Sequence, residues 1–199
     1  MVADKSTDNR KVEILAAAQA LIFEQNTVKI SLNEIASHLG ITHVALYRHF
    51  KNKDDLWFSL AKYWLFGTEA NLAEVTTASA VNPVEKLHIW LMTLTHTKQD
   101  TYQQHPAIFR LYTDMVQSHP ELEVEHLENL RKQILTIFKI EEPSTRNLAV
   151  AQAILDAFSL FYDPRHKELW LDAKIKVRQE NLWHLISPKI KIEFEQQGE

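Results

Sequence analysis

Apolar side chains recur along the chain at the three- and four-residue spacing that places them on one face of a helix. The spacing is clearest between residues 151 and 161, where five of them follow one another at helical intervals (Ala151, Ile154, Leu155, Phe158 and Phe161). No segment alternates apolar and polar residues beside hairpin turn residues, so strands are not expected. The pattern therefore predicts an all-α fold.

Prolines divide the later part of the chain. All six lie beyond residue 82, at Pro83, Pro106, Pro120, Pro143, Pro164 and Pro188. Proline fits the first turn of a helix but not its interior, and Asn82-Pro83 and Ser187-Pro188 each place it after a good N-cap residue. We therefore expect a series of helices, each opened by its proline. Two of the longer helices are expected over about Ser144–Phe161 and Arg165–Ile186.

The beginning of the chain predicts two helices in close succession. The first is expected from about Arg10 to Glu24, with Asp8 as its N-cap. The second begins at Ser31, where Ser31 and Glu34 have the spacing of a capping box. Gly40 ends this short helix, because a residue without Cβ permits the left-handed backbone of a tight turn.

Two further helices follow the glycine turn. Thr42 caps a third helix, expected from His43 to about Phe50, and Asn52 caps a fourth. Burying Leu46 and Phe50 leaves the other side of the third helix facing away, with His43, Ala45, Tyr47, Arg48 and His49 on it. A short helix, a turn and a second short helix form a helix-turn-helix, whose second helix enters the major groove of DNA. The alternative is a helical hairpin that only packs a core.

Charge and composition narrow the chemistry. Residues 1–60 hold seven basic and seven acidic side chains, and the rest of the chain carries the net charge of −4. Residues 41–53 contain Arg48, Lys51 and Lys53 and no acid, so positive charge is local to about one helix length. This is a small electrostatic footprint, which could bind nucleic acid only through a well-aimed surface. Three glycines are too few for a glycine-rich phosphate loop, and the absence of cysteine excludes thiolate chemistry.

Nothing in the sequence predicts export or a membrane partner. The opening segment MVADKSTDNRK is polar and is not followed by a long apolar run, so no signal peptide is expected. No uncharged apolar stretch approaches the ~20 residues that a membrane span needs. We therefore expect a cytoplasmic protein.

Four stretches near the N-terminus resemble one known family in register. They are SLNEIA (31–36), LGIT (39–42), LYRHF (46–50) and NKDDL (52–56), and over about residues 8–58 they resemble the DNA-binding domain of TetR/AcrR family transcriptional regulators. The resemblance implies a three-helix DNA-binding domain over residues 1–55 and a larger helical domain for effector binding and dimerisation over residues 56–199. Two positions depart from the family pattern: Asn26 replaces a usual glycine, and Val44 replaces a small residue.

The resemblance also implies which side chains meet a palindromic operator duplex. Thr42, Tyr47 and Lys53 would contact phosphates, and Ser31 would do the same at a helix N-terminus. The implied base-facing residues are His43, Val44 and Ala45 of the recognition helix and Asn33 of the helix before it. His49 completes the expected DNA-binding set.

The second domain is expected to hold a dimer surface and an effector pocket. One helix-turn-helix makes too few contacts for specific affinity, so a homodimer is expected. We expect its surface on apolar faces of the helices over 144–161 (Ala151, Leu155, Phe158) and 165–186 (Trp170, Ile175, Leu182, Trp183, Ile186), and the alternative is that these faces only form a core. An apolar cavity with a few polar groups suits a small lipophilic effector, and the candidate residues are Trp64, Trp90, His96, Phe109, Tyr112 and Phe158.

Two other functions stay open at this point. His119, Glu123 and His126 fall on one predicted helix face, as do Glu180 and His184, and this spacing could hold zinc in a metal-responsive regulator of the same fold. A solvated charged face is the alternative. A helical enzyme is less well supported, because no acid–base pair or nucleophile stands out. The sequence thus predicts a ligand-responsive repressor without cofactor, catalytic residues or metal.

Overall fold

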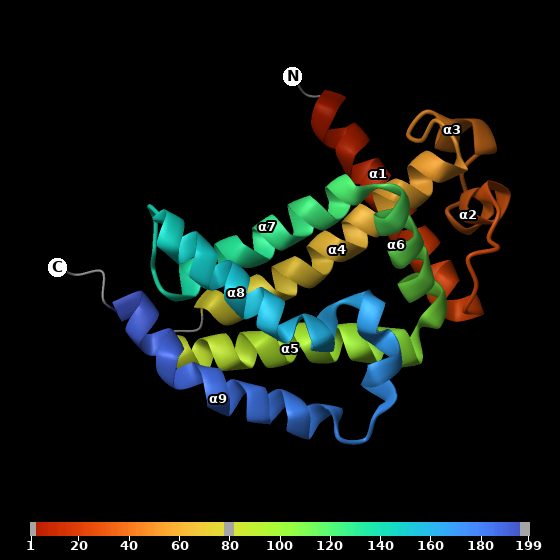
Figure 1. Cartoon of the computed structure of the whole chain (residues 1–199). Helices are drawn as coiled ribbons and strands as arrows, with labels where there is room; N and C mark the ends of the chain where they lie inside the picture. Colours follow the sequence, from red (N-terminus) through yellow and green to blue (C-terminus); the bar gives the residue numbers. More distant parts are fainter. Residues whose placement is uncertain (1–2, 78–81, 196–199) are drawn as a thin grey trace. The chain divides into compact units, whose positions relative to one another are not determined.

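The computed structural model describes residues 3–77 and 82–195, and every regular element in these ranges is a helix (Figure 1). The first four are α1 (Ala3–Gln25), α2 (Leu32–His38), α3 (His43–Tyr47) and α4 (Lys53–Thr77). They are followed by α5 (Pro83–Gln104), α6 (Pro106–Ser118), α7 (Pro120–Ile137), α8 (Thr145–Tyr162), the 3₁₀ helix η1 (Pro164–Leu171) and α9 (Ile175–Glu195). The all-α prediction is confirmed. No helix in the described ranges is long and apolar enough to cross a membrane.

The described residues form two compact units. Unit 1 comprises the chain up to Gly67 together with Gln103–Glu123, and unit 2 comprises Thr68–Tyr102 and the chain from Val124 onward. Helix α4 therefore supplies its first part to unit 1 and its last part to unit 2. The boundary expected after residue 55 divides the chain by function rather than by packing, and it stays a prediction.

Local capping chemistry positions the short helices of unit 1. At the start of α2, the Ser31 hydroxyl accepts from the Glu34 backbone N–H (3.2 Å), and the Glu34 carboxylate accepts from the Ser31 backbone N–H (2.7 Å). The expected capping box is thus confirmed. Gly40 has a φ of 64° in the turn that follows, and Asn26 has a φ of 47° after α1. Asparagine tolerates this left-handed backbone better than most residues, so it can replace the family's glycine there.

Two expected helix limits near the N-terminus are wrong. Helix α1 begins at Ala3, so Asp8 lies inside the helix instead of capping it. Helix α3 ends at Tyr47 and does not reach Phe50, although Phe50 is buried as expected. The side chains after α3 serve the next helix: Asn52 Oδ1 accepts from the Asp55 backbone N–H (2.8 Å), and the Asp55 carboxylate accepts from the Lys51 N–H (2.9 Å).

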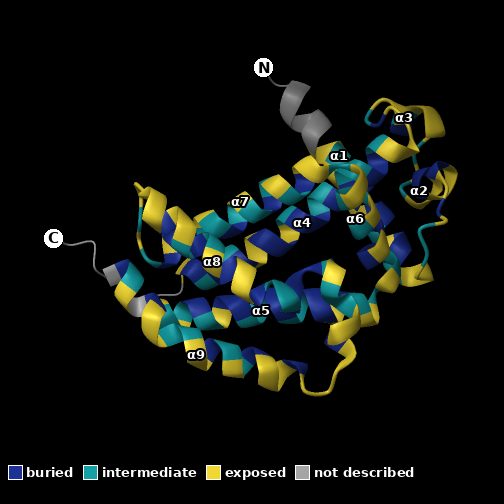
Figure 2. Cartoon of the chain, viewed as in Figure 1, coloured by how far each residue is buried: buried dark blue, intermediate teal, exposed yellow. Residues whose placement is uncertain are grey.

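The core of unit 2 takes the side chains that the sequence assigned to a dimer surface. Ala151, Leu155 and Phe158 of α8 are fully buried, and Trp170, Ile175 and Trp183 are also buried (Figure 2). Leu182 and Ile186 are partly buried and pack against the same core. The six buried residues therefore cannot form the expected dimer surface, whereas Leu182 and Ile186 keep part of their surface exposed. The alternative, that their faces form a core, is confirmed, because unit 2 buries the larger apolar side chains of both helices.

Prolines open most of the helices, with one exception. Pro83, Pro106, Pro120 and Pro164 are the first residues of their helices, and Pro143 precedes the N-cap Ser144 of α8. Pro188, however, lies inside α9, so the expectation that it opens a helix is wrong. An internal proline removes a backbone hydrogen bond. The helix continues past it because Ile190 and Phe194, two and six residues further on, are buried in the core.

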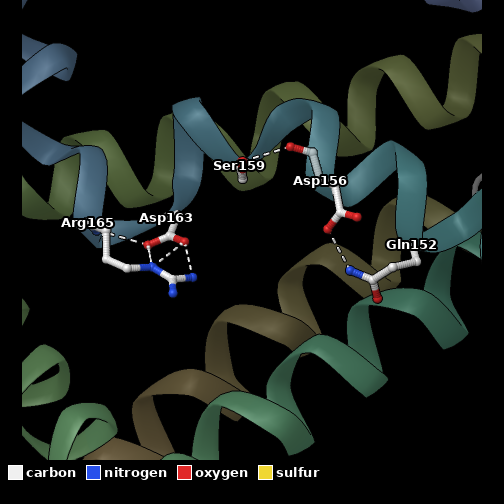
Figure 3. A network of polar contacts seen from close by, with 5 residues as sticks. All are labelled: Gln152, Asp156, Ser159, Asp163 and Arg165. Atoms are coloured by element: carbon white, nitrogen blue, oxygen red, sulfur yellow. Dashed lines mark hydrogen bonds and ion pairs between the residues drawn. The ribbon is translucent and has the colours of Figure 1, made fainter.

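The single helix expected over 165–186 is instead divided into η1 and α9. Figure 3 shows why α8 ends before it: the Asp163 carboxylate accepts from the Arg165 backbone N–H (2.9 Å) and side-chain Nε (2.8 Å to Oδ2). Burial opposes ionisation of Asp163, but the hydrogen bonds from Arg165 outweigh it and hold the pKa of Asp163 below its usual value. Asp172 makes a similar bond to the Lys174 N–H (2.9 Å) after η1. Asp163 thus separates α8 from η1, and Asp172 lies where the helix expected over 165–186 is divided.

Candidate nucleic-acid interface

The outward face of α3 is set by one buried anchor. Leu46 is fully buried in unit 1, in a core that also takes Ile35 of α2 and Phe50. Because residues one position away lie on other sides of a helix, this anchor turns the opposite side of α3 outward. Val44 is 67% exposed and Tyr47 is 45% exposed, and Figure 2 shows that much of α3 carries the colour of exposed residues.

Most of the predicted DNA-binding residues lie at the surface. Seven are exposed (Ser31, Asn33, Thr42, His43, Val44, Tyr47 and Lys53), and the other two, Ala45 and His49, are half-buried. His49 Nδ1 is buried without a hydrogen-bond partner in the described ranges. The side chains from α2, α3 and the start of α4 belong to one compact unit, as a joint contact surface requires.

The N-cap residues of α2 and α3 differ in the donors they keep. Thr42 Oγ1 accepts from the Ala45 N–H (3.1 Å), which leaves its hydroxyl hydrogen available. Ser31 instead donates both its hydroxyl (2.6 Å) and its backbone N–H (2.7 Å) to Glu34 Oε2. These bonds from Ser31 lower the pKa of Glu34. To donate to a phosphate, Ser31 must therefore give up one of its hydrogen bonds to the Glu34 carboxylate.

A histidine and a tyrosine share the exposed face of α3. The His43 and Tyr47 rings lie edge to face, with centroids 4.7 Å apart and planes at 89°. Edge-to-face pairs of this kind restrict both rings. The expected base-facing residue and the expected phosphate-facing residue are therefore positioned together, one helical turn apart.

Two lysines of unit 1 are positioned over aromatic rings. Lys53 Nζ lies 5.3 Å from the centre of the Trp57 ring, and Lys11 Nζ lies 5.2 Å from the centre of the Phe50 ring. Cation–π contacts hold such side chains without neutralising them. Lys11 could not be found from the sequence, because only tertiary packing brings α1 beside Phe50.

The expected effector-binding residues divide between the two units. In unit 1, Trp64 stacks on Tyr112 (centroids 4.8 Å apart), and Phe109 meets Tyr112 edge to face (5.3 Å). In unit 2, Trp90 and Phe158 are fully buried, and Trp90 Nε1 donates to Gln133 Oε1 (2.8 Å).

His96, the remaining expected effector residue, is half-buried in unit 2. Burial and the charge of Lys176 lower its pKa. Neither of two surface cavities of unit 2, ≈ 400 Å³ between α8 and α9 and ≈ 610 Å³ beside Phe138 and Phe194, is lined by any of the six expected residues.

The histidines do not assemble a metal site in the described ranges. His119 Nδ1 lies 3.2 Å from Glu121, whereas His126 Nδ1 lies 2.5 Å from Glu69 inside unit 2. Glu180 pairs with His88 (3.0 Å) rather than with His184. No group of three potential metal ligands occurs in this part of the chain, so the observed partners do not support the zinc hypothesis.

Comparison with known proteins identifies the family. Residues 14–60 match the model of "Bacterial regulatory proteins, tetR family", and residues 83–183 match that of a "Tetracyclin repressor-like, C-terminal domain". The chain belongs to the TetR family of bacterial regulatory proteins. The helix-turn-helix of α2 and α3 lies within the first match, so the hairpin alternative is excluded. TetR family proteins are regulators of transcription rather than enzymes.

Individual TetR-type relatives are distant. The transcriptional repressor BepR of Brucella suis biovar 1 (strain 1330) is 25% identical over 129 residues, which is 63% of this chain and 60% of BepR. The transcriptional regulator SAB2452 of Staphylococcus aureus (strain bovine RF122 / ET3-1) is 41% identical over 58 residues, which is 29% of this chain and 30% of that protein. The matches thus span less than two thirds of these relatives.

Solved structures agree in fold. A TetR transcriptional regulator from Rhodococcus sp. RHA1 gives a TM-score of 0.57 at 18% identity, covering 96% of this chain and all of that one (100%). A TetR regulator from Legionella pneumophila gives 0.57 at 17% identity, with coverage of 89% and 95%. At such identities the likeness shows the TetR fold alone.

Proposed function

We propose that this TetR family regulator is a repressor that binds a palindromic operator in the cytoplasm as a homodimer and is released by a small lipophilic effector. The observation that carries the proposal is the outward face of α3. Leu46 is fully buried on one side, while Val44 and Tyr47 remain exposed on the other. A helix with one buried anchor and a projecting face is what a major groove admits.

The proposed DNA contacts are of two kinds: contacts to phosphates, which position the protein, and contacts to bases, which recognise the sequence. Tyr47, Thr42 and Lys53 donate to phosphates, which fixes the register of α3 on the duplex. His43, Val44 and Ala45 meet base edges, and the exposed Val44 side chain suits the methyl group of a thymine. Asn33 reaches a base from α2, and Ser31 and His49 supplement the phosphate contacts.

A groove between α8 and α9 supports the homodimer. Ala149, Ala153 and Ala157 succeed one another at four-residue spacing on the outer side of α8, and with Ile186 and Ile190 of α9 they line the ≈ 400 Å³ cavity. Rows of small residues let helices from two molecules approach closely. A second copy of the chain offers the same surface, so the two can pair about a twofold axis.

Further apolar side chains of α9 extend this surface. Leu185 is 76% exposed and Ile192 is 48% exposed. At the edge of the groove, Arg146 Nε donates to Glu193 Oε2 (3.1 Å). An apolar centre with a charged rim is the usual anatomy of a protein interface.

Effector response follows from linkage. A ligand releases DNA only if it binds more tightly to a conformer whose two recognition helices no longer match the groove spacing. Within unit 2 its proposed contacts are Trp90, His96 and Phe158, and within unit 1 they are Trp64, Phe109 and Tyr112, whose rings are in contact. The match of residues 83–183 to a tetracycline repressor-like C-terminal domain supports an effector role for this part of the chain.

Selection of bound duplexes from a pool of bacterial genomic fragments tests the proposal. We expect enrichment of palindromes whose half-sites lie one turn apart, about 34–36 Å, or a multiple of it. The control is the variant Val44→Glu. Because Val44 is exposed, the variant should fold as the wild type does, but its carboxylate would be repelled by the phosphates of the duplex. If the wild-type protein enriches nothing beyond this control, it does not bind DNA as proposed.

A further inference from the structure

Glu69 of α4 is held inside unit 2 by three side chains of α7. Its carboxylate accepts from His126 Nδ1 (2.5 Å) and from Asn129 Nδ2 (2.9 Å), and its backbone carbonyl accepts from Gln133 Nε2 (2.9 Å). The three donors stand at i, i+3 and i+7, so they lie on one face of α7. Glu69 is 5% exposed and His126 is 9% exposed. We call these four residues the α4–α7 clamp.

The clamp lies beside a second buried ionisable group, so its hydrogen bonds must all be made. Lys98 of α5 is also buried, and burial lowers its pKa to about 8 against the opposing effects of Glu69 and Asp163. Burial and the Lys98 charge also lower the pKa of His126, although Glu69 raises it. His126 is therefore neutral at neutral pH and donates through Nδ1, while its buried Nε2 has no hydrogen-bond partner in the described part of the chain. A buried carboxylate is costly unless its hydrogen bonds are made.

The clamp acts on a helix that both units share. Helix α4 is continuous from Lys53, a proposed phosphate contact, to Thr77, and Glu69 lies in its later part. Apolar contacts tolerate small sliding movements, whereas a network of buried hydrogen bonds is either made or broken. Such a two-state element is what conformational coupling needs.

We infer that the α4–α7 clamp sets operator affinity by fixing α4, with Glu69, His126, Asn129 and Gln133 as positioning residues. The inference rests on the proposed function, since it concerns how strongly the same protein holds its operator. The clamp residues touch no DNA. They hold α4 in the conformer that binds, and any effector that favours the broken clamp weakens binding.

An exchange of charge between two clamp residues tests the inference. In Glu69→Gln, the new amide group at position 69 faces the amide group of Asn129, so two donors can meet. In Asn129→Asp, the new carboxylate at position 129 faces the carboxylate of Glu69. In the double variant, the amide introduced at position 69 donates to the carboxylate introduced at position 129, and the pair is restored. With the duplex selected from the genomic pool, we expect each single variant to bind roughly tenfold more weakly and the double variant to bind within about threefold of the wild type.

Two measurements separate positioning from general stability. Gln99→Met removes another buried hydrogen bond of unit 2, from Gln99 Nε2 of α5 to the Phe161 carbonyl of α8 (3.0 Å). It should lower the unfolding midpoint but leave operator affinity unchanged. The salt dependence of binding should keep its slope in the clamp variants, because the number of phosphate contacts is unchanged.

Three results would contradict the role of the clamp. The inference is wrong if both folded single variants bind as tightly as the wild type, if the double variant is no better than the singles, or if Gln99→Met weakens binding equally. If the single variants do not fold, Asn129→Ala at its half-buried position removes only one bond and should still weaken binding roughly threefold. Wild-type protein that enriches no duplex contradicts the proposed function and not the clamp.

Discussion

Lys98 is a buried cation whose cost can be measured through pH. A pKa of about 8 in place of 10.5 corresponds to about 3 kcal/mol, at about 1.36 kcal/mol per pH unit. Between these values the folded protein carries fewer protons at this site than the unfolded chain does. The free energy of unfolding must therefore rise with pH across this window.

Comparison with Lys98→Met isolates this contribution, because methionine fills a similar volume without a charge. We expect the unfolding free energy of the wild type, relative to the variant, to increase by about 3 kcal/mol between pH 8 and 10.5. Urea unfolding followed by tryptophan fluorescence at about pH 7, 8, 9 and 10 measures it, with both proteins at one concentration so that association contributes equally. A difference that stays constant to within about 0.5 kcal/mol from about pH 8 to 10 would show that folding does not lower the pKa of Lys98.

Three further predictions concern the DNA-binding face, the clamp and the dimer. Tyr47→Ala should weaken binding to all duplexes about equally, whereas His43→Ala should relax base preference at one position; an unchanged profile across operator variants would show that His43 reads no base. Because the pKa of His126 is lowered, acidification below about 6.5 should reduce the free energy of unfolding, and His126→Gln should lose this dependence. Leu185→Glu should give a folded monomer in sedimentation experiments, and a dimer that persists would place the interface elsewhere.

The DNA-binding end could be predicted well from the sequence, because its elements depend on nearby residues. Ser31 and Glu34 cap α2, Thr42 caps α3 and Asn52 caps α4, as their spacing indicates. Leu46 is the expected anchor. Such bonds form within three or four residues and require no knowledge of the rest of the fold.

Packing overrode local signals elsewhere. Pro188 follows a good N-cap residue and yet lies inside α9, because Ile190 and Phe194 beyond it are buried. Most of the residues expected at the dimer surface are buried for a related reason. Helical periodicity shows that α8 has apolar faces, but only packing decides that Phe158 faces the core and that Ala153 stays outside.

The amino-acid order alone determined the helical class, the helix-turn-helix and the family, since these depend on capping, periodicity and short motifs. Tertiary structure alone decided which groups meet inside unit 2. Glu69 lies 57 and 60 residues from the side chains that bind its carboxylate. No spacing rule connects residues so far apart, because their approach depends on how whole helices pack and on the need of a buried charge for partners.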